Sequence, residues 1–334
     1  MSADLAPPSD PTQRPAVPPR PDGCVRLPHW GLVRARGEEA ARFLHGQLTN
    51  AVDPLPAGLL RRAGYCSAKG RLQASFLLWR PADDEVMLAC HASVLAATLK
   101  RLTMFVLRSR CKLGDAGAPG DPAALVATGL AGDTARRALA AAGLVDAGRW
   151  AAAEGGSLLA LESVDGSSRA VWIAPADRPA PGTTDAPTLD LATWQALEVR
   201  AGVPVIEAAT VDQFVPQMLN YELIGGVDFK KGCYPGQEVV ARSQYRGTVK
   251  RRMFLFEVPA PAAPGQEVFH DADPGQPAGM VVNAAPSGDG SVALVEVKLA
   301  AVGRGELHLG APDGPVLGPG ELPYPVPMDS IADA

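Results

Sequence analysis

The stretch KKGCYPGQE, residues 230–238, places one cysteine between glycines and beside two lysines. A thiol near ammonium groups loses its proton more readily, and the thiolate is the form that attacks electrophiles or binds metals. Gly232 and Gly236 permit positive φ or close approach of a ligand to the backbone, and Pro235 stiffens the turn. Cys233 is therefore a candidate reactive thiol, the alternative being a small buried hydrophobe, as most free cysteines are.

The same stretch opens a basic run. From Phe229 to Arg252 there are seven lysines and arginines and one acid, Glu238, which gives a local charge of +6 in a chain whose net charge is −5. A cationic strip raises the local concentration of an anionic ligand and pairs with it. RNA is one such ligand, because Tyr245 can stack a base, but the acidic charge of the whole chain argues against direct nucleic-acid binding.

Composition limits the class of protein. A chain of 334 residues, 47% of them hydrophobic, is long enough to bury two or three cores. It has no apolar run long enough to span a membrane, and its N-terminus does not begin with basic residues followed by an apolar stretch. Neither a membrane partner nor a secretory signal is therefore expected. Its five cysteines are scattered and form no C-x-x-C pair, which disfavours a disulfide framework or a zinc site and predicts a cytoplasmic location. No motif of a metalloprotease, nucleotidase or dinucleotide-binding site is present.

The order of elements predicts an α+β fold. Residues 1–23 carry seven prolines and are expected to be a disordered tail. A first α+β unit spans residues 24–114, with helices expected at 38–48 and 93–105 and strands at 71–80, 85–91 and 106–113. This order favours helices packed on an antiparallel sheet.

Two further units follow after a Gly/Pro-rich break. Residues 115–249 form a second α+β unit, with strands expected at 124–130, 157–163 and 169–174, and helices at 133–142 (capped by Asp133), 191–201 and 214–225. Residues 250–325 alternate in short segments separated by Gly and Pro, which is typical of a small β-barrel. The basic run lies at the junction, where binding sites are common.

Four segments carry a family resemblance. FLHGQLTN (43–50), FVPQMLN (214–220), GGV (225–227) and KGCYPGQE (231–238) resemble the YgfZ family of folate-binding proteins, relatives of the T protein (aminomethyltransferase) of the glycine cleavage system. The likeness extends from about Cys24 to about Gly320. It implies two interleaved α/β (ferredoxin-like) domains and a C-terminal β-barrel, arranged as a ring around a folate channel.

The resemblance also implies a site. Cys233 and Lys231 would be its reactive centre, and the cofactor would be tetrahydrofolate or a derivative, whose ring can stack on indole and whose glutamate tail can pair with cations. The implied folate-binding residues are Trp30, Asn50, Trp194, Glu198, Arg200, Lys231, Tyr234, Gln237, Glu238, Arg242 and Arg246. No metal-binding residue is assigned.

The departures from T proteins bear on activity. Where T proteins have adjacent acids, this chain has Gln73 and Ala74, and where they have a glutamate it has Arg200. A neutral amide cannot act as a general base as a carboxylate can, so aminomethyl transfer is disfavoured. The resemblance therefore favours a non-catalytic accessory factor in iron–sulfur cluster assembly or repair, linked to iron–sulfur-dependent tRNA modification, with iron–sulfur client proteins as partners. The alternative is a tetrahydrofolate-dependent one-carbon transferase or demethylase acting on a small amine.

Overall fold

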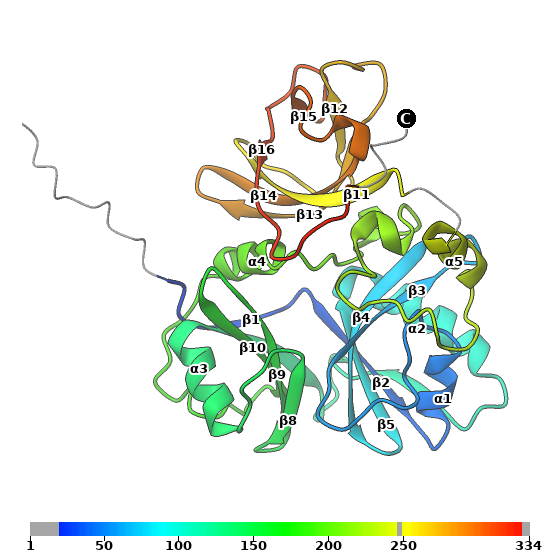
Figure 1. Cartoon of the computed structure of the whole chain (residues 1–334). Helices are drawn as coiled ribbons and strands as arrows, with labels where there is room; N and C mark the ends of the chain where they lie inside the picture. The colour runs from blue at the N-terminus through cyan, green and yellow to red at the C-terminus, as the bar shows by residue number, and fades with distance from the viewer. Residues whose placement is uncertain (1–19, 246–248, 329–334) are drawn as a thin grey trace, which may run out of the picture.

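The computed structural model describes residues 20–245 and 249–328. They form three antiparallel sheets, each in its own lobe, and the lobes meet at the centre of the molecule (Figure 1). Most of the tail predicted to be disordered, residues 1–19, lies outside the described part. No helix within the described ranges is both long and apolar enough to cross a membrane.

The first sheet has the strand order β3-β4-β5-β2-β6. Two helices cover one face of it, and Leu44, Leu88 and Leu102 are fully buried between helices and sheet. Alternation of apolar residues along the strands gives the sheet this buried face. The elements are β2 (Trp30–Arg36), α1 (Ala40–His45), β3 (Arg61–Cys66), β4 (Leu72–Ala82), β5 (Glu85–His91), α2 (Ala92–Val106) and β6 (Lys112–Asp115).

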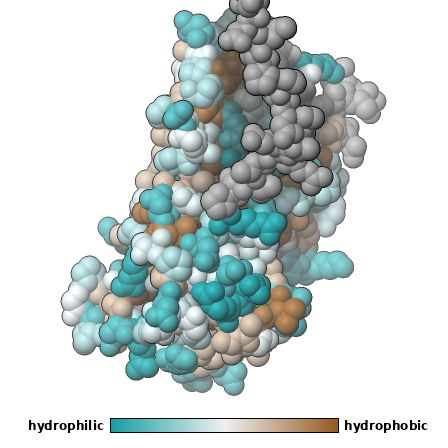
Figure 2. Space-filling view, turned by 90° about the vertical axis from the view of Figure 1, so that its left-hand side faces the viewer, coloured by the Kyte–Doolittle hydropathy of each residue, from teal (hydrophilic) through white to brown (hydrophobic). Residues whose placement is uncertain are grey.

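The second sheet has the order β1-β7-β10-β9-β8 and is covered by α3. Its edge strand β1 precedes β2 in sequence, so the chain crosses from the second sheet to the first between these two strands. The elements are β1 (Gly23–Arg26), β7 (Leu125–Ala131), α3 (Gly132–Ala141), β8 (Arg149–Ala153), β9 (Gly156–Val164) and β10 (Ser167–Pro175). The side of the molecule at the left of Figure 1 is mostly polar, with apolar residues in small separate groups (Figure 2).

The third sheet is a half-barrel with the order β15-β12-β13-β14-β11-β16. Helix α4 packs on β13 and β14 and thereby joins this sheet to the other two. The elements are α4 (Leu191–Arg200), α5 (Gln237–Tyr245), β11 (Arg251–Val258), β12 (Glu267–His270), β13 (Gly279–Ser287), β14 (Gly290–Lys298), β15 (Leu307–Leu309) and β16 (Gly318–Pro319). The predicted α+β class with antiparallel sheets is confirmed, and so is the all-β texture of the C-terminal part.

Three local predictions were wrong. The strand expected at 106–113 begins only at Lys112, because α2 runs on to Val106 and a turn follows. The helix expected at 214–225 is a single 3₁₀ turn, Pro216–Leu219, since Asn220 adopts the left-handed conformation that ends it. Asp133 does not cap α3; the Asp22 carboxylate accepts the Thr134 N–H instead. The helix α5 was not predicted.

The inner faces of the first two sheets share a core that contains Trp194 of α4. This indole is fully buried and lies against Gly129 of β7, where an added Cβ would come within 2.7 Å of the ring. A glycine at this strand position therefore lets the indole pack directly on the sheet.

We expect Gly129→Ala to lower the free energy of unfolding by about 1–3 kcal/mol, because the new methyl group overpacks the Trp194 site. Gly114→Ala is the matched control: Gly114 is also in a strand, and a Cβ there meets nothing within 4 Å. Urea unfolding of both variants tests this, and equal stabilities would contradict it.

Candidate functional site

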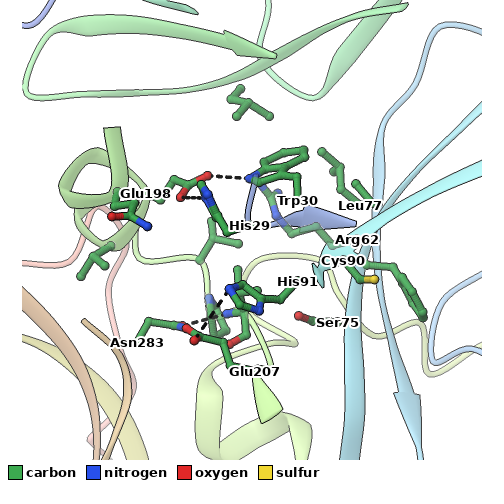
Figure 3. Close-up of a pocket in the computed structure, with 18 of the residues that line it drawn as sticks. His29, Trp30, Arg62, Ser75, Leu77, Cys90, His91, Glu198, Glu207 and Asn283 are labelled. Atoms are coloured by element: carbon green, nitrogen blue, oxygen red, sulfur yellow. Dashed lines mark hydrogen bonds and ion pairs between the residues drawn. The ribbon is translucent and has the colours of Figure 1, made fainter. Parts of the chain in front are cut away.

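A cavity of about 210 Å³ lies where the three sheets meet. Every lobe contributes to its wall, including strands β3, β4, β5, β9, β10 and β13 and helix α4 (Figure 3). Phe76, Leu77 and Tyr221 are among the apolar and aromatic residues of the wall, and several charged side chains converge between them. An apolar cleft with few convergent polar groups at a domain junction is the usual form of a small-molecule site.

The first polar group of the cavity is centred on the Glu198 carboxylate. It accepts hydrogen bonds of 2.8 Å from Trp30 Nε1 and 2.8 Å from His29 Nε2, and the Glu198 side chain keeps 20% of its surface exposed. Burial alone would raise the pKa of Glu198, but the hydrogen bonds from His29 and Trp30 and the charge of Arg169 lower it below its usual value. Glu198 is therefore an anion at neutral pH.

The second polar group faces the first. His91 Nε2 lies 3.8 Å from the Glu207 carboxylate, and the Asn283 amide donates to Glu207 Oε1 at 2.8 Å. The His91 and His29 ring centroids are 6.1 Å apart, and Figure 3 shows both rings between the two carboxylates. Burial, which Glu207 only partly offsets, lowers the pKa of His91, so this imidazole is neutral at pH 7.

Two arginines complete the charges of the cavity. Arg62 forms a bidentate pair with Glu162 at 2.6 and 2.7 Å. Arg169 is only 3% exposed, lies 5.4 Å from the centroid of the Trp194 ring, and has a buried Nε with no partner. A buried donor without a partner is costly, and a bound ligand with an acceptor atom near Arg169 would satisfy it. The cavity thus offers acceptors at Glu198 and Glu207 and a donor at Arg169.

The Cys233 loop lies elsewhere. Cys233 is exposed, whereas the neighbouring Lys231 is buried and donates through Nζ to the His45 and Leu48 carbonyls, at 2.7 Å in the latter case. Lys231 Nζ also lies 4.9 Å from the centroid of the Tyr234 ring. Burial, partly offset by Asp228 and Cys233, lowers the pKa of Lys231 to about 8, so part of this amine is neutral at slightly alkaline pH.

Several cations of the basic run are already paired within the protein. Arg252 is buried and pairs with Glu222, while Arg251 pairs with Glu296. Lys231 is directed at carbonyl oxygens. Of the remaining cations in the described part of the run, Lys230, Arg242 and Lys250 are exposed. These three are the members available to an anionic partner.

The structure separates the predicted folate-binding residues. Among those that the structure describes, only Trp30 and Glu198 line the central cavity. Trp194 has no exposed surface and lies beneath Arg169, and Arg200 points to the third sheet, where it contacts Glu257 at 2.7 Å.

The other predicted residues lie at or near the Cys233 loop or outside the described residues. The Asn50 amide donates to the Arg62 and Gly225 carbonyls and so supports the fold locally. Tyr234 is buried, Gln237 is half-buried, and Glu238 and Arg242 are exposed. Arg246 lies outside the described residues. Folate contact by each of these side chains stays a prediction.

Strand β3 separates the cavity from a second, more open pocket. Arg62 lines the cavity, while Arg61 lines the second pocket together with Asn50, Lys230 and Tyr245. Successive side chains of a strand point to opposite faces, so the two pockets lie on opposite sides of β3. The second pocket borders the Cys233 loop.

Several cavity residues were missed in the sequence: His29, His91, Arg62, Glu162, Arg169, Glu207 and Asn283. Their separations along the chain are large, 169 residues for the His29–Glu198 pair, so no local motif joins them. The only sign of these residues in the sequence was that His29 stands next to Trp30, a predicted folate-binding residue. Within the described ranges, no group of three or more His, Cys, Asp or Glu side chains is arranged to hold a metal ion.

Comparison with solved structures identifies the fold. No protein-family model matches the chain. The structure of this chain is similar to that of the glycine cleavage system aminomethyltransferase T from Bartonella henselae. The match covers 91% of this chain and 86% of that one, with a TM-score of 0.70 and 19% sequence identity. A heterotetrameric sarcosine oxidase from Corynebacterium sp. U-96, in complex with pyrrole 2-carboxylate, matches 44% of this chain and 73% of its own with 16% identity and a TM-score of 0.29. The chain therefore has the fold of the aminomethyltransferase.

We expect iodoacetamide to modify Cys233 first and Cys66 and Cys90 last. Burial raises the pKa of Cys66 and of Cys90 to about 12, so at pH 8 only about one in 10⁴ of these thiols is a thiolate, and neither is exposed. Peptide mass spectrometry of the native protein over time measures the order. Labelling of Cys66 at the rate of Cys233 would contradict it, and labelling in urea is the control that all thiols can react.

Proposed function

We propose that this chain is a YgfZ-type protein that binds a reduced folate in the central cavity and assists iron–sulfur enzymes through Cys233. The proposal joins the sequence motif at residues 230–238 to the aminomethyltransferase fold. One observation carries its folate part: two carboxylates, Glu198 and Glu207, converge on a cavity with aromatic walls. Localisation in the cytoplasm, where such clients are made, belongs to the same proposal.

The cavity fits the ring system of a folate. The pyrimidine edge of a pterin presents N–H donors, which match the acceptors Glu198 and Glu207, and a carbonyl oxygen, which matches the unpaired Arg169 Nε. A volume of about 210 Å³ is below the roughly 300–1,000 Å³ of sites that enclose whole drug-sized ligands. The ring would be enclosed, and the tail of the ligand would lie outside the cavity.

The thiol function rests on the exposure of Cys233. An exposed cysteine can ligate iron or exchange sulfur with a client without opening the fold. One cysteine cannot complete a four-thiolate site, so the client or a second ligand would supply the other donors. Iron–sulfur-dependent tRNA modification would then depend on this protein through the client enzymes, without direct RNA binding.

A second candidate is favoured by the carboxylates of the cavity. Although Gln73 and Ala74 replace the acids of T proteins, Glu198 and Glu207 bring negative charge to the cavity from other elements. A carboxylate close to a bound folate can stabilise a developing cation or accept a proton. A folate-dependent one-carbon transferase or demethylase acting on a small amine is therefore the alternative, and folate-dependent formation of formaldehyde by the purified protein would favour it.

Tetrahydrofolate binding, measured anaerobically by calorimetry, tests the folate proposal. We expect Glu207→Gln and Glu198→Gln each to weaken binding about 10- to 100-fold, because each removes a charged acceptor from a desolvated site. Glu238→Gln is the matched control, since Glu238 is exposed on α5 and away from the cavity. Loss of binding in Glu238→Gln, with both cavity variants unaffected, would instead place the ligand at the Cys233 loop.

The thiol is tested separately in a deletion strain. We expect Cys233→Ser to bind tetrahydrofolate as the wild type does, because Cys233 does not line the cavity, and to fail to restore the activity of iron–sulfur enzymes. Full complementation by Cys233→Ser would remove the accessory role while leaving folate binding intact. The two parts of the proposal can therefore fail independently.

A further inference from the structure

Three large apolar side chains are exposed together at the C-terminal end of α2. Met104, Phe105 and Leu107 keep 66%, 46% and 86% of their surface exposed. Elsewhere in the part of the chain that the structure describes, large exposed apolar side chains lie at least six positions apart in sequence. Single exposed apolar residues are ordinary, whereas a cluster marks a contact surface.

The packing of α2 keeps these three side chains on the surface. Helix α2 buries Val94, Thr98 and Leu102 against the first sheet, so Met104 and Phe105, which follow on other sides of the helix, cannot join the same core. Leu107 ends the helix with φ +45°, a conformation that a side chain other than glycine rarely adopts. The chain therefore keeps a leucine exposed at a position where glycine would fit more easily.

The charges on the stretch that carries the cluster are all of one sign. The stretch from Ala92 to Gly114 contains five lysines and arginines and no acid. Arg110 pairs with Glu38 of the neighbouring segment. Lys100, Arg101 and Arg108 are exposed and have no carboxylate within ion-pair distance among the residues placed by the structure.

We propose that this end of α2 is a peripheral membrane-binding surface, which inserts Met104, Phe105 and Leu107 at the headgroup level of an anionic bilayer. Apolar insertion and attraction of nearby cations to anionic lipid are the two contributions that reversible attachment requires. The exposed cations Lys100, Arg101 and Arg108 match the negative surface potential of an anionic leaflet. Of the three side chains only Phe105 can stack on a base, whereas single-strand binders use several aromatic residues on which successive bases stack, so the cluster suits a lipid surface better than nucleic acid.

Figure 1 shows that this attachment leaves the central cavity accessible. Helix α2 lies on the outer side of the first lobe, away from the meeting point of the three sheets. Its inner side contacts β2, β4, β5 and β6. A protein held by the end of α2 would keep its central cavity free for a ligand.

Sedimentation with lipid vesicles tests the proposal on the full chain. We expect the wild type to bind vesicles of phosphatidylcholine with about one-third phosphatidylglycerol, and to bind pure phosphatidylcholine at least about tenfold more weakly. The double variant Met104→Ser/Leu107→Ser should lose about tenfold or more of the partition coefficient on anionic vesicles. Arg101→Gln and Arg108→Gln should each lose roughly fivefold there and nothing on neutral vesicles.

Val145→Ser is the matched control. Val145 is 92% exposed in the connection between α3 and β8, and its replacement should leave vesicle binding unchanged. Thermal unfolding of each variant checks that the fold is intact. The proposal is overturned if the wild type does not sediment with anionic vesicles, if the double variant binds as well as the wild type, or if Val145→Ser has the same effect as the double variant.

Discussion

The Glu198 carboxylate is the group on which the three lobes depend. Its two donors, His29 and Trp30, lie where the chain passes from β1 in the second sheet to β2 in the first. Glu198 itself belongs to α4, which packs on β13 and β14 of the third sheet. One charged acceptor thus connects all three sheets, and hydrogen bonds to a charged group are the strong ones. Loss of the donors would leave a poorly solvated anion without compensation, which is costly.

The same arrangement produces the cavity. Three sheets that meet at one place leave a space between them, and the side chains that reach it come from every lobe. The third sheet contributes through Asn283, which lies at a register shift in β13 and bonds Val205 and Glu207. A bulge of this kind redirects a side chain toward a site. Binding of a ligand between these groups would stabilise the contacts among lobes as well as the ligand itself.

The sequence predicted the helices and strands better than it predicted the cavity between them. The strand at 85–91 was found with its observed bounds, because apolar β-formers are followed there by a clear helix start. Local signals could not identify the 3₁₀ turn at Pro216–Leu219, since the apolar spacing of residues 214–225 also suits a helix and tertiary contacts decide the outcome. The cavity was less predictable still: the register of β9 and β10 places Glu162 near Arg169, and Arg62 reaches Glu162 from another sheet. Neither strand register nor the packing of sheets is visible in one sequence.

The motif at residues 230–238 and the central cavity therefore lie in two different regions of the protein, and strand β3 stands between them. Arg61 faces the pocket beside the Cys233 loop and Arg62 faces the cavity. The Asn50 amide bonds the Arg62 carbonyl on this strand and the Gly225 carbonyl in the segment that leads to the loop. A shift of β3 on ligand binding would change the hydrogen bonds of Asn50 and so reach the segment that leads to the Cys233 loop. Coupling between the cavity and Cys233 is thus expected to act through the position of this edge strand, because the Cys233 side chain does not itself reach the cavity.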